Sequence, residues 1–427
     1  TDGNTYAWGR NDYGELGDDT RTDRNTPVRV HTPAGVRFTS VSAGNEFSLA
    51  IGSDGHAYSW GYNGSGQLGN DTSTYHRTPE QVHAPTNGDN PANTWKTISA
   101  GYWHSLAIGS DGHAYSWGAN GYGQLGDGSN DVSDRPEQVH APTNGGNPAN
   151  TWKTISAGDQ FSLAIGSDGH AYSWGANDYG QLGNGTNTRS NRPEQVHAPD
   201  SGNPANTWKT ISTGGSRSLA IGSDDHAYSW GANYCGQLGN GSSDDNPHSR
   251  PEQVHAPTNG GNPANTWKTI SAGGYHSLAT GSDGHAYSWG WNWHGELGDG
   301  SIYGRSTPAL IGHKITVTGA TFEPTNAPTP TWNPTTHTWD TTSPTHPEGQ
   351  ATVTIHWTLD GVTQTDYPIN PYEYYHLYTL PKAGGAPTQQ LAGATLLTLT
   401  TLTALTLTSH HITRKHHHTH QPTTTSK

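Results

Sequence analysis

The sequence has 427 residues, among them 56 Gly, 16 Trp and 20 Tyr, but only 4 Phe and no Met. Only 13% of the residues are charged and 29% are hydrophobic, a composition typical of short strands joined by tight turns. The formal net charge of −14 opposes binding to a phosphate backbone, so we expect no nucleic-acid partner. The single cysteine, Cys235, excludes both an intramolecular disulfide framework and a cysteine zinc site.

One phrase recurs about every 57 residues through the first three quarters of the chain. Residues 109–126 show it as GSDGHAYSWGANGYGQLG. The tryptophan of each copy falls at Trp8, Trp60, Trp117, Trp174, Trp230 and Trp289. A period of this length indicates supersecondary units that bury their apolar faces against one another in a stack or a ring.

Each repeat predicts four strands, as residues 151–198 illustrate. Residues 152–158, 162–167, 170–176 and 192–198 are rich in β-forming residues, and Asp168-Gly169 is a two-residue hairpin signal. Pro193 indicates an edge position for the fourth strand, because proline cannot donate to a central ladder. Four antiparallel strands repeated about an axis predict an all-β fold, a β-propeller made of such blades.

The phrases at residues 99–126 and 271–301 resemble the regulator-of-chromosome-condensation repeat, and the resemblance covers residues 1–310. It implies a propeller, usually of seven blades, which we assign to residues 1–312. Six repeats are visible, and the first lacks its two inner strands. We therefore expect one or more blades upstream of Thr1; the alternative is a six-bladed ring closed in another way.

Two short windows differ from repeat to repeat, one after Ser-Ala-Gly or Ser-Thr-Gly and one after Trp-Gly. In a four-stranded meander these windows join the first strand to the second and the third to the fourth, so both lie on one face. Aromatic residues with scattered polar groups predict a ligand-binding face there, although neutral drift at loop tips is an alternative. The candidate residues are Phe47, Tyr102, Trp103, His104, Tyr122, Phe161, Tyr179, Arg217, Tyr234, Tyr275, His276, Trp291 and Trp293.

The recurring Asp and His of the Ser-Asp-Gly-His turns do not predict catalysis. Each repeat carries one Asp-His pair, and pairs spread around a ring cannot converge on one substrate. We therefore interpret the Asp as a turn residue and the His as the first residue of a strand. We see no nucleophile with a base, no phosphate-binding loop and no convergent carboxylates. The sequence therefore predicts a protein that is not an enzyme, with no catalytic residue, no metal and no cofactor.

The chain changes character after residue 312. Residues 315–322, 336–342 and 351–361 alternate β-branched and aromatic residues between breaks rich in Pro, Asn and Gly. We assign residues 313–378 to a small all-β domain that resembles the immunoglobulin-like spacer modules of bacterial surface proteins. The alternative is an unstructured stalk rich in Thr and Pro.

Residues 379–427 resemble the sorting signal of Gram-positive surface proteins, which a sortase transpeptidase joins to the cell wall. The matching pentapeptide is Leu380, Pro381, Lys382, Ala383 and Gly384, with Ala383 where Thr is usual. An apolar run over residues 391–407 follows, and then a basic, His-rich tail. We expect a single membrane segment before processing, although the alternation of Leu and Thr is also typical of a strand.

These observations predict a wall-anchored surface protein whose propeller loops bind an extracellular protein or glycan. One alternative is a secreted inhibitor of an extracellular enzyme, since propellers of this repeat family include a β-lactamase inhibitor. A second is guanine-nucleotide exchange, the role that gave the repeat its name. The acidic charge and the sorting signal both speak against exchange.

Overall fold

The computed structural model describes residues 3–311 except 89, 91–92, 145, 148–149, 201–202, 204–205, 258–261 and 263, followed by the backbone of eight strands between residues 315 and 398. The chain divides into two compact units, Thr1–Gly312 and His313–Lys427. Each unit is described separately below.

Unit 1 contains five antiparallel four-stranded sheets in which the strands follow chain order, preceded by one two-stranded sheet. We call these sheets blades. Blade 1 has β1 (Tyr6–Gly9) and β2 (Arg24–Arg29). Blade 2 has β3 (Phe38–Ala43), β4 (Phe47–Gly52), β5 (Ala57–Gly61) and β6 (His76–Gln81). Blade 3 has β7 (Trp95–Ala100), β8 (His104–Gly109), β9 (Ala114–Gly118) and β10 (Ser133–Gln138).

Blades 4 to 6 repeat the pattern. Blade 4 has β11 (Trp152–Ala157), β12 (Phe161–Gly166), β13 (Ala171–Gly175) and β14 (Ser190–Gln195). Blade 5 has β15 (Trp208–Thr213), β16 (Arg217–Gly222), β17 (Ala227–Asn233) and β18 (Asp244–Gln253). Blade 6 has β19 (Trp267–Ala272), β20 (His276–Gly281), β21 (Ala286–Gly290) and β22 (Arg305–Leu310).

The Asp-Gly turns join the second and third strands, as the sequence predicts. In blade 4, Gly169 has a φ of +88°, which favours glycine, and the Gly166 amide closes the turn on the His170 carbonyl at 2.9 Å. Asp168 accepts the His170 amide at 3.0 Å and the Tyr172 hydroxyl at 2.6 Å. The Asp of the recurring Asp-His pair is therefore a turn residue. Pro193 lies on β14, the outermost strand, which confirms its edge position.

Neighbouring blades are joined by apolar packing and by a repeated set of hydrogen bonds. Trp174 is fully buried, and it packs against Leu106 and Ile108 of blade 3. Its indole N–H donates to the Gln124 carbonyl at 2.8 Å. The Ser162 hydroxyl donates to the same carbonyl at 2.8 Å. The blade junction is therefore the hydrophobic core of the unit.

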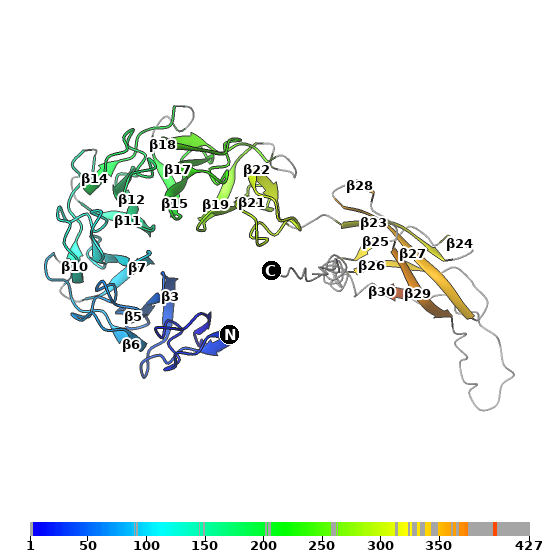
Figure 1. Ribbon diagram of the computed structural model, residues 1–427, viewed down its shortest axis with the longest axis horizontal. Helices are drawn as coiled ribbons and strands as arrows, with labels where there is room; N and C mark the ends of the chain where they lie inside the picture. The colour runs from blue at the N-terminus through cyan, green and yellow to red at the C-terminus, as the bar shows by residue number, and fades with distance from the viewer. Residues whose placement is uncertain are drawn as a thin grey trace, which may run out of the picture. The chain divides into compact units, whose positions relative to one another are not determined.

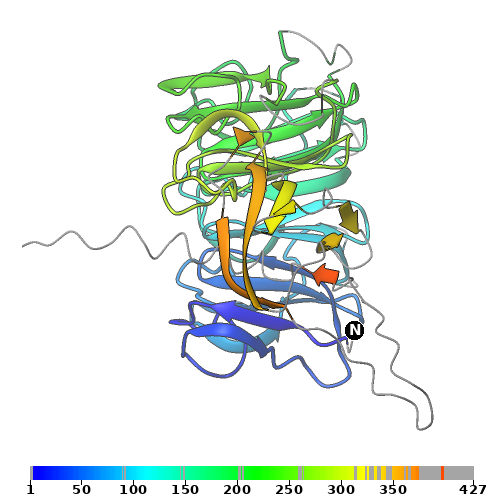
Figure 2. The same cartoon turned by 90° about the vertical axis from the view of Figure 1, so that its right-hand side faces the viewer.

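The six sheets follow one another around an arc (Figure 1). The first sheet has two strands, which confirms that the first repeat lacks its inner pair. Blades 1 and 6 lie apart at the two ends of the arc, and the number of blades that closes the ring stays a prediction. Seen edge-on in Figure 2, the strands run from one face of the arc to the other, which places the connecting loops at the two faces.

Unit 2 is also all-β in the part that the structure describes. One sheet contains β24 (Thr325–Asn326), β23 (Ile315–Phe322), β27 (Gly349–Leu359) and β28 (Val362–Thr363) in that order, with β29 (Tyr367–Tyr374) also paired to β27. A second sheet contains β25 (Thr331–Asn333), β26 (Thr338–Thr342) and β30 (Leu396–Thr398).

The predicted sorting signal, Leu380 to Gly384, lies outside the described residues. Of the predicted membrane segment over residues 391–407, the structure describes only β30, where the chain is a strand. Across the part of the chain that is described, we find no helix with the length and apolar character needed to cross a bilayer.

Candidate functional site: the loop face

The two variable windows meet at one end of every four-stranded blade. We call the connection from the first strand to the second the first loop, and the connection from the third to the fourth the third loop. A backbone hydrogen bond joins the two loops in each of these blades. The five bonds run from the amides of Tyr62, Ala119, Ala176, Ala232 and Trp291 to the carbonyls of Glu46, Trp103, Gln160, Ser216 and Tyr275, over 2.7 to 3.0 Å. The prediction that both windows share one face, here called the loop face, is confirmed.

A buried asparagine at the start of each third loop holds that loop in place. In blade 4, Asn177 accepts the Leu182 amide at 3.0 Å, and its amide group donates to the Thr186 and Thr188 carbonyls at 2.9 and 3.0 Å. The loop is therefore anchored at three points along its length. Asn11, Asn63, Asn120, Asn233 and Asn292 occupy the same position in the other blades and are all buried. Residues that differ between blades are thus carried on a common, hydrogen-bonded framework.

Four candidate residues are not on the exposed surface, and the prediction for them is wrong. Phe47, His104, Phe161 and Arg217 each begin the second strand of a blade and are 1% exposed or less. Their side chains fill the junction with the following blade. The Arg217 guanidinium, for example, donates to the Gly274 carbonyl at 2.8 Å and to the Ser277 hydroxyl at 3.0 Å. His276, at the same position in blade 6, is half-buried.

The other candidate residues are exposed or half-buried on the loop face. Tyr102, Trp103, Tyr179, Tyr234, Tyr275 and Trp293 are 38% to 67% exposed, and Tyr122 and Trp291 are half-buried. Five of these rings form a continuous row across blades 4 to 6, which we call the aromatic strip. Its members are Tyr179, Tyr234, Tyr275, Trp291 and Trp293, with ring centroids 6.4, 5.7, 6.4 and 4.5 Å apart in that order.

The rings outside the aromatic strip are grouped separately. Tyr102 and Trp103 form an edge-to-face pair with centroids 4.8 Å apart. The Arg189 guanidinium lies 4.3 Å from the centre of the Tyr122 ring and is paired with Asp178 at 3.0 Å. Blade 3 thus presents its own aromatic contact surface beside the strip.

The sequence windows missed several exposed apolar residues of the third loops. Tyr75, Val132, Ile302 and Tyr303 are 45% to 77% exposed and lie further along these loops, just before the fourth strand. The loops differ in length and sequence after Leu-Gly, and this difference in the sequence could have identified these residues as part of the variable surface.

Charge beneath the aromatic strip is buried rather than displayed. Burial lowers the pKa of the Arg217 guanidinium to about 10, so it stays charged at neutral pH. Burial raises the pKa of the neighbouring Asp159 carboxyl, and the charge of Arg217 opposes that rise. Burial also raises the pKa of Tyr234. The Tyr234 ring of the strip is therefore neutral at physiological pH.

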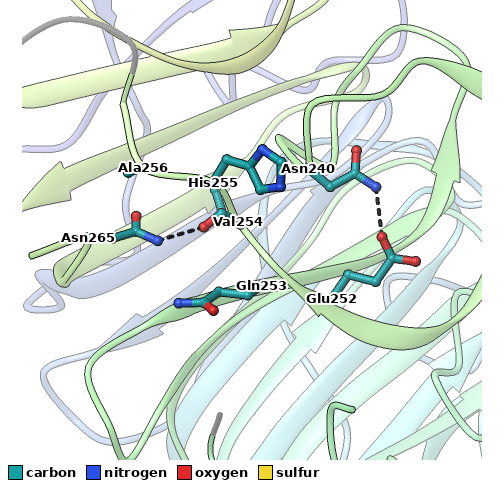
Figure 3. Close-up of a pocket in the computed structure, with 7 residues that line it drawn as sticks. All are labelled: Asn240, Glu252, Gln253, Val254, His255, Ala256 and Asn265. Carbon is teal, nitrogen blue, oxygen red and sulfur yellow. Dashed lines mark hydrogen bonds between the residues drawn. The ribbon is translucent and has the colours of Figure 1, made fainter. Parts of the chain in front are cut away.

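Two hollows of unit 1 lie at equivalent positions in different blades. Figure 3 shows one of about 610 Å³ beside β18, where Asn240 donates to the Glu252 carboxylate at 2.7 Å and Asn265 to the Val254 carbonyl at 2.8 Å. A hollow of about 670 Å³ in blade 2 has the equivalent lining, including Glu80, Val82 and Asn93. Because the hollow recurs with the same lining, we interpret it as a consequence of the repeated blade structure. Among the described residues, no group of three or more His, Cys, Asp or Glu side chains is placed to hold a metal ion.

Four-stranded sheets around an arc, with exposed rings gathered on one loop face, define a β-propeller of the protein-interaction class. Residues 1–267 match the family described as RCC1-like domain, and residues 267–296 match the Regulator of chromosome condensation (RCC1) repeat. The chain belongs to this family, as its repeat phrases predict.

The relatives that are 30% or more identical to this chain include a plant protein and a human protein. The ultraviolet-B receptor UVR8 of Arabidopsis thaliana is 31% identical over 306 residues, which are 71% of this chain and 65% of the relative. The human E3 ubiquitin-protein ligase HERC2 is 30% identical over 256 residues, 60% of this chain and 5% of the relative. The match thus spans less than two thirds of either protein's length.

Solved structures that share the fold include a yeast protein and a human protein. Yeast RCC1 (Prp20), solved with Kap60 bound, superposes with a TM-score of 0.57 at 23% identity over 73% of each chain. Human WBSCR16 superposes with a TM-score of 0.60 at 19% identity, over 83% of this chain and 87% of that one. At these identities the likeness establishes the propeller fold.

Proposed function

We propose that this protein is a non-enzymatic surface protein whose loop face binds a partner protein outside the cell. The observation that supports this proposal is the one-sided distribution of exposed apolar side chains. Among the described residues, most of the large exposed apolar side chains lie in the first or third loops. The three that do not are Tyr6 and Trp8 on β1 and Val41 on β3. Exposed apolar patches of this kind are typical of protein interaction sites.

The geometry of the rings favours a protein over a glycan. Successive rings from Tyr179 to Trp291 are inclined to each other by 56° to 59°, so the strip is a series of notches rather than a flat platform. Notches between rings accept the side chains of a partner, and aromatic residues dominate the energy of protein interfaces. Yeast RCC1, which shares the fold, was solved with a protein, Kap60, bound.

Attachment to a Gram-positive cell wall is the part of the proposal that rests on sequence alone. Its support is the order of the pentapeptide at Leu380 to Gly384, the apolar run over residues 391–407 and the basic tail. A sortase would cleave within the pentapeptide and join the chain to the wall. Expression in a Gram-positive host tests this: the protein should stay with the wall fraction, and substitution of Leu380 and Pro381 by Ala should release it. Equal release of both forms would contradict anchoring and favour a diffusible inhibitor.

The binding proposal is tested with the full chain against a panel of purified extracellular proteins and a panel of polysaccharides that includes peptidoglycan. We expect a protein to bind and the Trp293→Ala variant to bind it at least about tenfold more weakly, because exposed Trp residues are frequent energetic centres of interfaces. Trp8→Ala is the matched control, since Trp8 is 63% exposed and Trp293 is 67% exposed. Binding to polysaccharides alone, or equal binding by both variants, would contradict a protein-binding loop face.

A further inference from the structure

The hairpin that carries the third loop of blade 5 is longer than its counterparts. Its strands β17 and β18 have seven and ten residues, whereas the third and fourth strands of blades 2, 3, 4 and 6 have five and six. The extension pairs Asn233 with Asp244, beside Tyr234 of the aromatic strip. His248 lies on the same strand as Asp244, opposite Gly231. A titratable side chain therefore lies at the base of this loop.

Both ring nitrogens of His248 face a carboxylate. Nδ1 lies 2.7 Å from Glu252 Oε1, and Nε2 lies 3.2 Å from Asp244 Oδ1. A neutral imidazole has one N–H and can donate to only one of these carboxylates, whereas the imidazolium donates to both. The His248 side chain is 14% exposed, so water has limited access to it. The arrangement therefore fits the charged form of His248.

A closed series of hydrogen bonds connects His248 to the third loop of blade 5. Asn240 donates to Glu252 at 2.7 Å (Figure 3) and accepts the Ser242 amide at 3.1 Å. The Ser242 hydroxyl donates to Asp244 at 3.0 Å. Both carboxylates that face the imidazole are therefore bonded to the loop as well.

The elements packed against His248 bring neutral groups or paired charges to it. Strand β17 places Gly231 opposite His248. The third loop of blade 4 approaches with Gly180, where a Cβ would lie 2.7 Å from the His248 carbonyl oxygen. The charged residues of that loop, Asp178 and Arg189, are paired with each other at 3.0 Å. The charge around the imidazole thus comes from its own strand.

The two carboxylates stay ionised while His248 loses its proton. The bond to Glu252 raises the pKa of His248 above its ordinary value and lowers the pKa of Glu252. Burial favours the neutral form of Asp244, but the hydrogen bonds that it accepts lower its pKa overall. The titratable groups of the loop itself are Tyr234 and Cys235, whose pKa values are raised by burial. His248 is therefore the group of this hairpin that changes charge first as the pH rises above neutrality.

We propose that His248, Asp244 and Glu252 form a pH-sensitive latch that holds the third loop of blade 5, and with it Tyr234 at the centre of the aromatic strip. Loss of the proton leaves a ring nitrogen without hydrogen beside a carboxylate and two negative charges without a counterion. The stability from the latch is complete only well below pH 6.5 and is lost as the pH rises through the higher pKa of folded His248. The consequence for partner binding rests on the proposed function of the loop face, but the order of the loop does not.

Hydrogen exchange of the full-length protein at pH 6 and pH 9, followed by mass spectrometry, tests the latch. The segment compared is residues 234–247, with rates corrected for the intrinsic effect of pH. The internal reference is the third loop of blade 4, where Ser190 occupies the position of His248. We expect residues 234–247 to exchange at least about fivefold faster at pH 9 relative to this reference, since a hydrogen bond to a charged group is worth at least that factor.

Matched variants assign the effect to His248. His248→Ser gives blade 5 the residue that blade 4 has at this position, and it should remove the pH dependence. His76→Ser is the control, because His76 lies at the same position in blade 2, opposite Gly61, and is paired with one carboxylate, Glu80, at 2.8 Å. It should leave the pH dependence of residues 234–247 unchanged.

An NMR titration of protein labelled at histidine Cε1 follows the proton itself. The His248 signal, identified by its loss in His248→Ser, should titrate above the ordinary value of 6.5 in wild type and at a lower pH in Asp244→Asn. A His248 signal that titrates at or below 6.5, the same pH dependence of exchange in wild type and His248→Ser, or its loss in His76→Ser would each overturn the proposal. A latch that responds to pH in a protein that binds no partner would count against the proposed function alone.

Discussion

His104 makes the stability of the propeller depend on pH, and the chain itself supplies the substitution that removes this dependence. The imidazole is 0% exposed, with Nε2 3.0 Å from the Ser162 hydroxyl and no hydrogen-bond partner for Nδ1. Burial lowers the pKa of His104 from 6.5 to about 3, so the folded protein holds it neutral. Phe47 and Phe161 occupy the same position in blades 2 and 4, so phenylalanine fits this blade junction.

The size of the effect follows from the two pKa values. Between about pH 6.5 and pH 3 the unfolded chain binds a proton at His104 and the folded chain does not. The stability from the neutral imidazole is therefore complete only well above pH 6.5 and is lost as the pH falls through that window. The loss is about 2 kcal/mol at pH 5 and about 0.2 kcal/mol at pH 7.

The assay is urea unfolding of wild-type protein and His104→Phe at pH 7 and pH 5, followed through the propeller transition. Ser162 retains its bond to the Gln124 carbonyl in the variant, so no new unsatisfied group is expected. The variant should be at least as stable as wild type at pH 7, and its advantage should grow by about 2 kcal/mol at pH 5. Other histidines contribute equally to both proteins. An advantage that is the same at both pH values would refute the reasoning.

Two further predictions concern the repeated framework. Gly69→Ala should lower the free energy of unfolding by about 2 kcal/mol, because Gly69 has a φ of +67° and a Cβ there would lie 2.7 Å from the Trp117 indole nitrogen. Gly121→Ala, with no atom within 4 Å of the added Cβ, should change it by less than about 0.5 kcal/mol in the same urea titration. Tyr58→Phe should cost about 1 to 2 kcal/mol at pH 7, since the hydroxyl donates to Asp54 at 2.6 Å. Unchanged denaturation midpoints for Gly69→Ala or Tyr58→Phe would contradict these assignments.

The propeller was predictable because the same strand and turn signals occur in every repeat. The Asp-Gly turns, the edge proline at Pro193 and the alternation around Trp174 all indicate four antiparallel strands, and the structure places them so. The meeting of the two variable windows follows from the same meander. Residues 315–374 are not repeated, so no second copy supports the strand pattern read from them. The sequence therefore predicts strands there but not how they are arranged in sheets.

The burial of four candidate residues was not predictable from variation between repeats. Variation indicates an exposed surface only where a side chain has no local partners. At the first position of the second strand, different residues are accommodated by different partners, the Ser162 hydroxyl for His104 and the Gly274 carbonyl for Arg217. Comparison of the repeats cannot distinguish a buried position, where each residue has its own partner, from an exposed position that varies freely. Only the packing between blades shows that these side chains are buried.

The sameness of the blade junctions affects how such a gene can change. Each junction uses an indole-to-carbonyl bond of the same kind, from Trp117 to Gln67 at 2.9 Å and from Trp230 to Gln181 at 2.9 Å. Recombination between two copies of the repeat would therefore add or remove a whole blade while leaving every new contact equivalent to an old one. Arrays of this kind can grow or shrink in single genetic steps, and each step brings a different set of loops to the face that meets other molecules.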